Sequence, residues 1–326
     1  MLLIESRHLR KTEAYRIYAN SLVRVVRNNC GTPALTLKHS ELLGAYLLGL
    51  VAVLIFGSTL PVTRLALESF SPGFVTFARA IIAACMAITL MVLNGLGWRH
   101  KENWSIFAAG LLLIFGFPGL MAVSMQTVDA SHGGIILGFL PLATAFIARF
   151  TTEERPSPKF WALTVAGFLI VTAFTIYQSG QAADTTVLHG YLWMFLAGVC
   201  AASGYVISGK LSRNMKGWEV ITRALVLNLP LSVLGMIYFH QDALSTPTES
   251  SIVALIYLGA FSMFLGFCAW NVALAKGGIA RIGQLQLLQI FVTLGVAVLL
   301  LDETLDVVTL ASAVTITAII ATSRRG

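Results

Sequence analysis

Long runs of apolar residues, separated by short polar breaks, cover most of the chain after residue 41. A membrane-spanning helix needs about 20 mostly apolar residues, and ten runs approach that length. They do not show the strict alternation of apolar and polar positions that a membrane β-barrel requires. The pattern therefore predicts an all-α polytopic membrane protein with ten transmembrane helices, at about residues 42–64, 72–95, 104–128, 131–149, 159–178, 189–209, 218–239, 252–275, 280–301 and 304–322.

The composition agrees with this class and excludes several others. Of the 326 residues, 57% are hydrophobic and 11% are charged, whereas a soluble domain has about 45–50% and 25%. Soluble, disordered and disulfide-scaffold proteins are thereby excluded. The four cysteines form no CxxC or CxxH pair, so we expect neither a metal site nor a cofactor.

The basic residues indicate the orientation of the chain. Of 22 Lys and Arg residues, 19 lie in the N-terminal segment, in alternate loops or at the C-terminus. Short loops rich in Lys and Arg face the cytoplasm, so both termini are predicted to be cytoplasmic, in a plasma (inner) membrane of the bacterial type. The net charge of +7 is spread over these loops, and this distribution argues against a nucleic-acid partner.

Residues 1–41 differ from the rest of the chain because they are basic and contain no long apolar run. Tyr15, Tyr18, Leu22 and Val25 recur at helical spacing with arginines between them. This predicts a basic amphipathic helix on the inner leaflet. A disordered tail and an over-called start codon are the alternatives.

The ten predicted spans divide into five plus five around the Gln178–His189 loop. An offset of 149 residues places the acidic pair Glu153-Glu154 on Asp302-Glu303. If the halves 42–178 and 189–323 are repeats, the odd number of spans makes the second copy inverted. Inverted repeats with a midplane site between them are an arrangement of secondary transporters.

An ordered set of motifs in these halves resembles the drug/metabolite transporter superfamily, and specifically a ten-span transporter with two EamA-type repeats. The motifs are Phe56-Gly57-Ser58-Thr59 with Arg64, Pro72 with Arg79, Pro141 with Glu154-Arg155, Trp270-Asn271, Ala273-Leu274-Ala275-Lys276-Gly277 and Asp302-Glu303. The resemblance implies a membrane transporter that carries its substrate outward.

Polar side chains inside the apolar runs are the candidates for substrate binding, because a polar group in the bilayer is costly. Arg79 lies about 10 Å into the second span at 1.5 Å per residue, and arginine suits a substrate carboxylate. The candidate substrate-binding residues are Ser58, Thr59, Arg79, Arg223, Trp270, Asn271, Gln286 and Gln289. The alternatives are snorkelling for the arginines, helix packing for the glutamines, interface anchoring for the tryptophan and a packing kink beside the two hydroxyls.

The sequence thus favours a secondary transporter of a small polar metabolite, an exporter of amino acids or similar compounds, working by alternating access at a midplane cavity. Every acidic residue lies in a tail, in a loop or at a span end, which disfavours a cation/proton exchanger. No nucleophile and base set is present, so no enzyme is predicted. A non-transporting scaffold or sensor and a flippase for lipid-type substrates stay open. The partners are then a small molecule and the lipid bilayer, and the sequence makes no prediction of oligomeric state.

Overall fold

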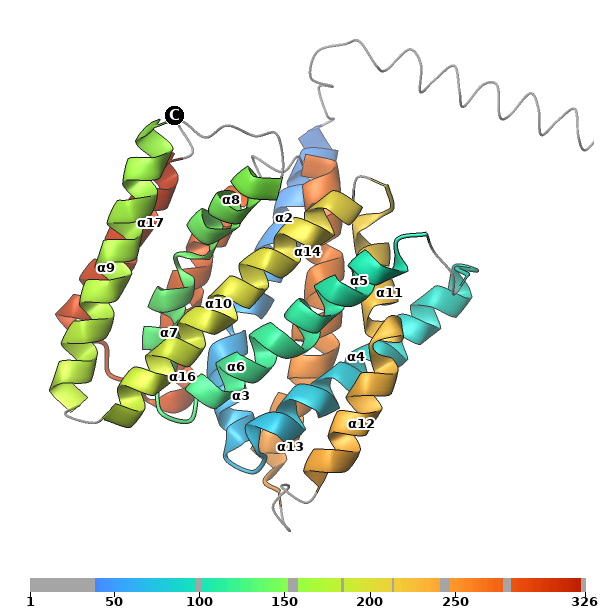
Figure 1. Cartoon of the computed structure of the whole chain (residues 1–326), viewed down its shortest axis with the longest axis horizontal. Coiled ribbons are helices and arrows are strands. Elements are labelled where there is room, and N and C mark those ends of the chain that lie inside the picture. The colour runs from blue at the N-terminus through green and yellow to red at the C-terminus, as the bar shows by residue number, and fades with distance from the viewer. Residues whose placement is uncertain are drawn as a thin grey trace, which may run out of the picture. The chain divides into compact units, whose positions relative to one another are not determined.

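The computed structural model describes residues 39–97, 101–151, 158–182, 185–212, 214–240, 247–277 and 283–323. Most of the basic segment 1–41 and the pair Glu153-Glu154 lie outside these residues. The elements of the described ranges are helices, as the apolar pattern predicted (Figure 1).

The elements follow one another without a long loop between described residues. The first half contains α2 (His39–Gly57), α3 (Thr59–Leu67), α4 (Pro72–Leu93), α5 (Asn103–Gly110), η1 (Leu111–Gly116), α6 (Phe117–Ser124), α7 (Ala130–Leu137), α8 (Leu140–Thr151) and α9 (Pro158–Ala182). The second half contains α10 (Thr185–Leu211), α11 (Gly217–Leu227), α12 (Leu229–Phe239), α13 (Glu249–Ile256), η3 (Tyr257–Leu265), α14 (Gly266–Gly277), η4 (Gly283–Leu287), α16 (Leu288–Leu301) and α17 (Val307–Ser323).

Six stretches of the described residues are long and apolar enough to cross a membrane, and a seventh is the bent pair α11–α12. The six are Leu42–Leu67, Pro72–Leu93, Asn103–Ser124, Trp161–Gln178, Thr185–Leu211 and Glu249–Ala273. Three shorter apolar helices, Ala130–Thr144, Leu285–Leu301 and Val307–Ile319, lie where the remaining spans are predicted. The chain is a polytopic membrane protein with six or seven full-length span candidates in its described part.

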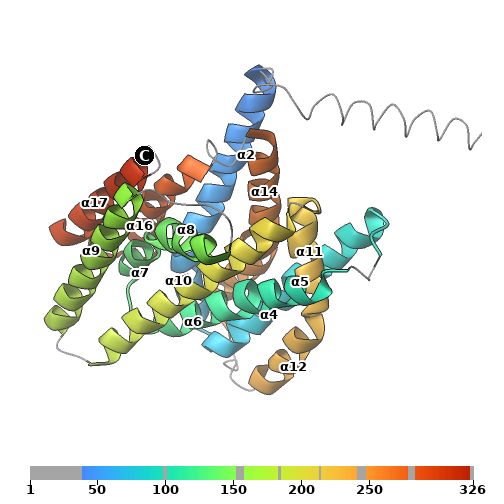
Figure 2. The same cartoon turned by 45° about the horizontal axis from the view of Figure 1, so that its top comes forward.

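Helices from the two halves pack against each other. α4 lies against α12 and η3, and α16 lies against α3 and α7. α9 and α17 run side by side in both views (Figures 1 and 2). Between α4 and α12, a Cβ atom on Gly235 would lie 2.3 Å from the Phe77 ring, so glycine permits the close approach. These contacts bring α3, α4 and η3 together, and the candidate site lies where they meet.

Proline explains the interruption of the first span. α2 ends at Gly57 and α3 begins at Thr59, as predicted from Gly57 and Pro61. Pro61 has no backbone N–H, so it cannot bond the carbonyl four residues earlier. That carbonyl belongs to Gly57, and the Thr293 hydroxyl of α16 donates to it at 2.8 Å. The break in one half is thus satisfied by a side chain of the other.

Other interruptions differ from the sequence prediction. Gly116–Gly119 was predicted as a break, but the helix continues through Pro118 after the π-helical segment η1. The predicted break at Asn228 is confirmed by a 49° bend between α11 and α12. The run 131–149 is interrupted at Gly138 and Phe139, which the sequence analysis did not predict.

Replacing Thr293 with valine should destabilise the protein by about 1–3 kcal/mol, because valine keeps the shape but leaves the buried Gly57 carbonyl without its donor. Unfolding of the detergent-solubilised protein by heat or denaturant measures the loss. Thr315→Val is the matched control, since the exposed Thr315 hydroxyl bonds only the Ala311 carbonyl of its own helix. Equal stability of the two variants would contradict a role for Thr293 at the break.

Candidate substrate-binding site

Arg79 is a buried cation with a single polar partner. α4 starts at Pro72, where the Ser71 hydroxyl accepts from the Phe74 amide, and this start places Arg79 two turns inside the helix. The side chain is 3% exposed. Its Nη2 donates to the Ser262 hydroxyl at 3.2 Å, while Nε and Nη1 have no partner among the described residues. The described residues also supply no ion pair to it.

Two hydroxyls complete the environment of this cation. The Oγ1 atom of Thr59, the first residue of α3 after the break, lies 2.8 Å from the Oγ atom of Ser262. Ser262 is buried within the π-helical segment η3, and π-helical turns inside α-helices are frequent at functional sites. A Cβ atom on Gly259, also in η3, would lie 2.9 Å from the Arg79 carbonyl, so glycine lets η3 approach α4. We call Thr59, Arg79 and Ser262 the Arg79 cluster.

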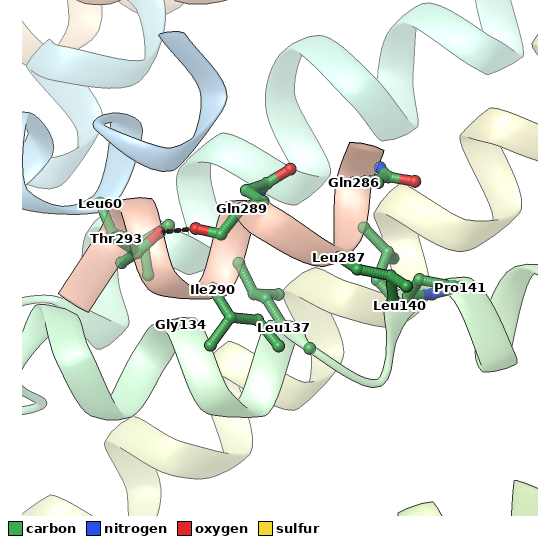
Figure 3. Close-up of a pocket in the computed structure, with 11 residues that line it drawn as sticks. Leu60, Gly134, Leu137, Leu140, Pro141, Gln286, Leu287, Gln289, Ile290 and Thr293 are labelled. Carbon is green, nitrogen blue, oxygen red and sulfur yellow. Dashed lines mark hydrogen bonds between the residues drawn. The ribbon is translucent and has the colours of Figure 1, made fainter. Parts of the chain in front are cut away.

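The glutamines predicted in the ninth span line a small hollow beside α3. Gln286 belongs to η4 and Gln289 to α16, and their amide ends lie on the side of this segment turned away from Gly134 (Figure 3). Leu60, the residue after Thr59, forms part of the wall. The complete lining is Leu60, Gly134, Leu137, Gly138, Leu140, Pro141, Gln286, Leu287, Gln289, Ile290 and Thr293.

The other predicted residues bond to local groups. Ser58 donates to the Leu54 carbonyl at 2.8 Å, and Asn271 donates to the Gly217 carbonyl at 3.1 Å. Trp270 packs edge-to-face on Phe56, with 6.5 Å between ring centroids. None of these contacts involves the Arg79 cluster.

Arg223 is buried like Arg79 but fully engaged. Its Nε bonds Glu219 Oε1 at 2.8 Å, one turn earlier on α11, and Nη1 donates to the Gly97 carbonyl at 2.7 Å. The charge of Arg223 is therefore balanced within the protein, whereas that of Arg79 is not. Of the eight predicted residues, the structure brings Thr59 and Arg79 together in one cluster.

A second charged cluster joins α3, α7 and the turn between α16 and α17. Arg64 Nη1 lies 2.6 Å from Asp129 and 3.5 Å from Glu303. Glu303 also accepts the backbone amides of Ala130 and Ser131, at 2.8 and 2.9 Å, at the start of α7. We call Arg64, Asp129 and Glu303 the Arg64 clasp. It links the first half of the chain to the second.

Asp306 lies beside the clasp, in the turn before α17. Desolvation raises the pKa of this carboxyl, but hydrogen bonds from the Thr309 hydroxyl and amide and from Gln178 outweigh it, so its pKa lies below the ordinary value. The bond to the Thr309 amide is a helix cap. Because the folded-state pKa is lowered, this stabilisation is present above the pKa of the unfolded chain and is lost as the pH falls through the folded value.

The helices and the buried polar cluster define a membrane transporter, and comparison with known proteins gives its family. The sequence profile of the EamA-like transporter family matches residues 43–176 and again residues 188–324. The chain belongs to this family, within the drug/metabolite transporter superfamily.

Relatives of known sequence are named as transporters. An uncharacterized transporter of Bacillus subtilis, YdeK, is 37% identical over 278 residues, which cover 85% of this chain and 96% of that protein. A probable amino-acid metabolite efflux pump of Salmonella typhimurium is 24% identical, with 83% of this chain and 91% of the relative covered. A crystal structure of another protein superposes with a TM-score of 0.60 at 19% identity, covering 86% of this chain and 97% of that one. This last likeness shows the fold.

Proposed function

We propose that this member of the family is a secondary transporter that exports a small polar metabolite, such as an amino acid or a similar compound, across the cytoplasmic membrane. The single observation that carries the proposal is the burial of Arg79 with one hydroxyl as its only partner in the described structure. A buried cation without a counter-charge is costly in a membrane protein and marks a substrate or ion pathway. Transport, and not catalysis, is the activity that this arrangement suits.

The proposed mechanism is alternating access between two inverted five-helix repeats, residues 42–178 and 189–323. The family profile matches the two halves separately, which supports this division. The π-helical segments support it as well: an offset of 149 residues carries η1 onto the last part of η3. The bent and shorter helices then complete ten spans, with the Arg79 cluster between spans one, two and eight.

The predicted orientation assigns a side of the membrane to the Arg64 clasp. With both termini in the cytoplasm, Asp129 and Glu303 lie in loops on the extracytoplasmic side. The clasp closes that side in the conformation described here, and the cargo would reach the Arg79 cluster from the cytoplasm. This direction suits an exporter.

The names of relatives support the cargo class only broadly. One relative is named as an amino-acid metabolite efflux pump, and another, from Chlamydia muridarum, as an S-adenosylmethionine/S-adenosylhomocysteine transporter. Both names describe small polar metabolites. A lipid-type cargo or a scaffold role would not require an under-partnered arginine in the interior.

Flux into proteoliposomes tests the proposal. The reconstituted full-length protein is offered radiolabelled amino acids, organic acids, polyamines and nucleosides, and we expect saturable flux of at least one class. Arg79→Gln should reduce that flux to the level of empty liposomes, while Lys210→Gln, at an exposed position on α10, should leave it unchanged. Flux that is equal in wild type and Arg79→Gln would remove the observation on which the proposal rests.

A further inference from the structure

The charge of Arg79 needs a partner that the described residues do not supply. No Asp or Glu is among the buried residues of the described ranges. The other two cations in described ion pairs, Arg64 and Arg223, already hold the nearby carboxylates of Asp129, Glu303 and Glu219. An isolated ion in a low-dielectric interior costs several kcal/mol. Resting on the proposed transport function, we propose that the cargo itself delivers this counter-charge, and that it is a small monocarboxylate anion.

The hydrogen bonds of the Arg79 cluster direct the free donors toward one kind of ligand. Arginine only donates, so Ser262 accepts from Nη2 and can pass its own proton to Thr59. Thr59 in turn donates to the Ile55 carbonyl at 3.2 Å. Both hydroxyl protons are then used within the protein. The donors that remain are the Nε and Nη1 N–H groups of one planar guanidinium.

A planar fork of N–H donors matches a carboxylate, which can accept two parallel hydrogen bonds. A neutral amide or alcohol offers a poorer match and no charge. Ser262 is therefore a positioning residue: its bond to Nη2 fixes the plane of the guanidinium that would face the carboxylate.

The charge balance favours a monoanion over a zwitterion or a dianion. A carboxylate neutralises Arg79, but the ammonium group of an amino acid would need a second counter-charge in the interior. The neighbouring hollow offers none, since its walls are apolar side chains, glycine, Thr293 and the neutral amides of Gln286 and Gln289 (Figure 3). A second carboxylate would lack a cation for the same reason. Hydroxy or oxo acids meet the requirement.

Matched ligands separate these cases with one side chain at a time. Lactate, alanine and lactamide share a three-carbon skeleton and differ in net charge, and phenyllactate, phenylalanine and phenyllactamide repeat the comparison with a larger group. Binding is measured by the thermal stability of the full-length protein in detergent at pH 7, because a ligand that binds the folded state raises it. Succinate is the dianion control.

We expect a hydroxy acid of one of the two series to bind at least about tenfold more tightly than its amino acid, with no shift from the neutral amide, since a charge-assisted bond is worth about 1.5–3 kcal/mol. Arg79→Gln should abolish the shift, and Lys210→Gln should retain it. Size-exclusion chromatography confirms that each variant is folded.

Three results would overturn the inference: equal or tighter binding of the amino acid, binding of the acid that survives in Arg79→Gln, and no shift with any acid in either series. Each leaves the transport proposal intact if proteoliposomes still show saturable flux of another cargo that depends on Arg79. Acid binding that requires Arg79, together with no flux of any compound, would instead support the ligand class and count against transport.

Discussion

Replacing Arg79 with methionine should make the ligand-free protein more stable, by about 1–4 kcal/mol, while it abolishes transport. Substituting a buried ionic group by an apolar one of similar volume is often stabilising by this amount, because the desolvation cost disappears. Arg79 is 3% exposed and has one hydroxyl partner, so little is lost in return. Thermal or denaturant unfolding in detergent, without added ligand, measures the change.

Arg223→Met provides the opposite expectation in the same protein. Arg223 is 7% exposed and pairs with Glu219, so its removal leaves a carboxylate without a counter-charge. Breaking such a buried pair costs about 3–5 kcal/mol. If the two variants lost similar amounts of stability, Arg79 would be a structural residue like Arg223, and its assignment to the cargo would be wrong.

Replacing Glu303 with glutamine should open the Arg64 clasp. The carboxylate is 9% exposed and receives two backbone amides and Arg64. Glutamine keeps one carbonyl acceptor but loses the charge, and a hydrogen bond to a charged group is worth about 1.5–3 kcal/mol. A loss of this size raises the ratio of open to closed molecules about tenfold or more.

The opening can be followed by the distance between spin labels at Glu68 and Val307, two exposed positions at the ends of α3 and α17. We expect a longer distance to become populated in Glu303→Gln. Asp302→Asn is the matched control, because Asp302 is exposed and has a left-handed backbone with φ of 52°, a conformation that asparagine also adopts. An unchanged distance distribution in Glu303→Gln would show that the clasp does not hold the two halves together.

The helical elements and the break after Gly57 could be predicted from sequence because their causes are local. Apolar length sets a span, and Pro61 removes an N–H within one turn. The group that satisfies the freed carbonyl, Thr293, lies 236 residues away, so no local pattern indicates it. Pro118 shows the limit of the same rule, since a π-helical segment precedes it in place of a break.

The site was predictable to the extent that burial of charge is visible in sequence. Arg79 and Thr59 were candidates because they interrupt apolar runs. Ser262 was not, because a serine inside an apolar helix usually bonds its own backbone. The engagement of Arg223 had a local signal, since Glu219 precedes it by four residues, a spacing that favours ion pairs on a helix.

The most direct test of alternating access asks whether the Arg79 cluster can be reached from both sides of the membrane. Thr59→Cys is introduced after the four native cysteines are replaced, and a membrane-impermeant thiol reagent is applied to right-side-out and to inside-out vesicles. We predict labelling of Thr59→Cys from each side, and protection from each side by a saturating cargo. Labelling from one side only, or from neither, would contradict a transporter that exposes this site alternately to the two compartments.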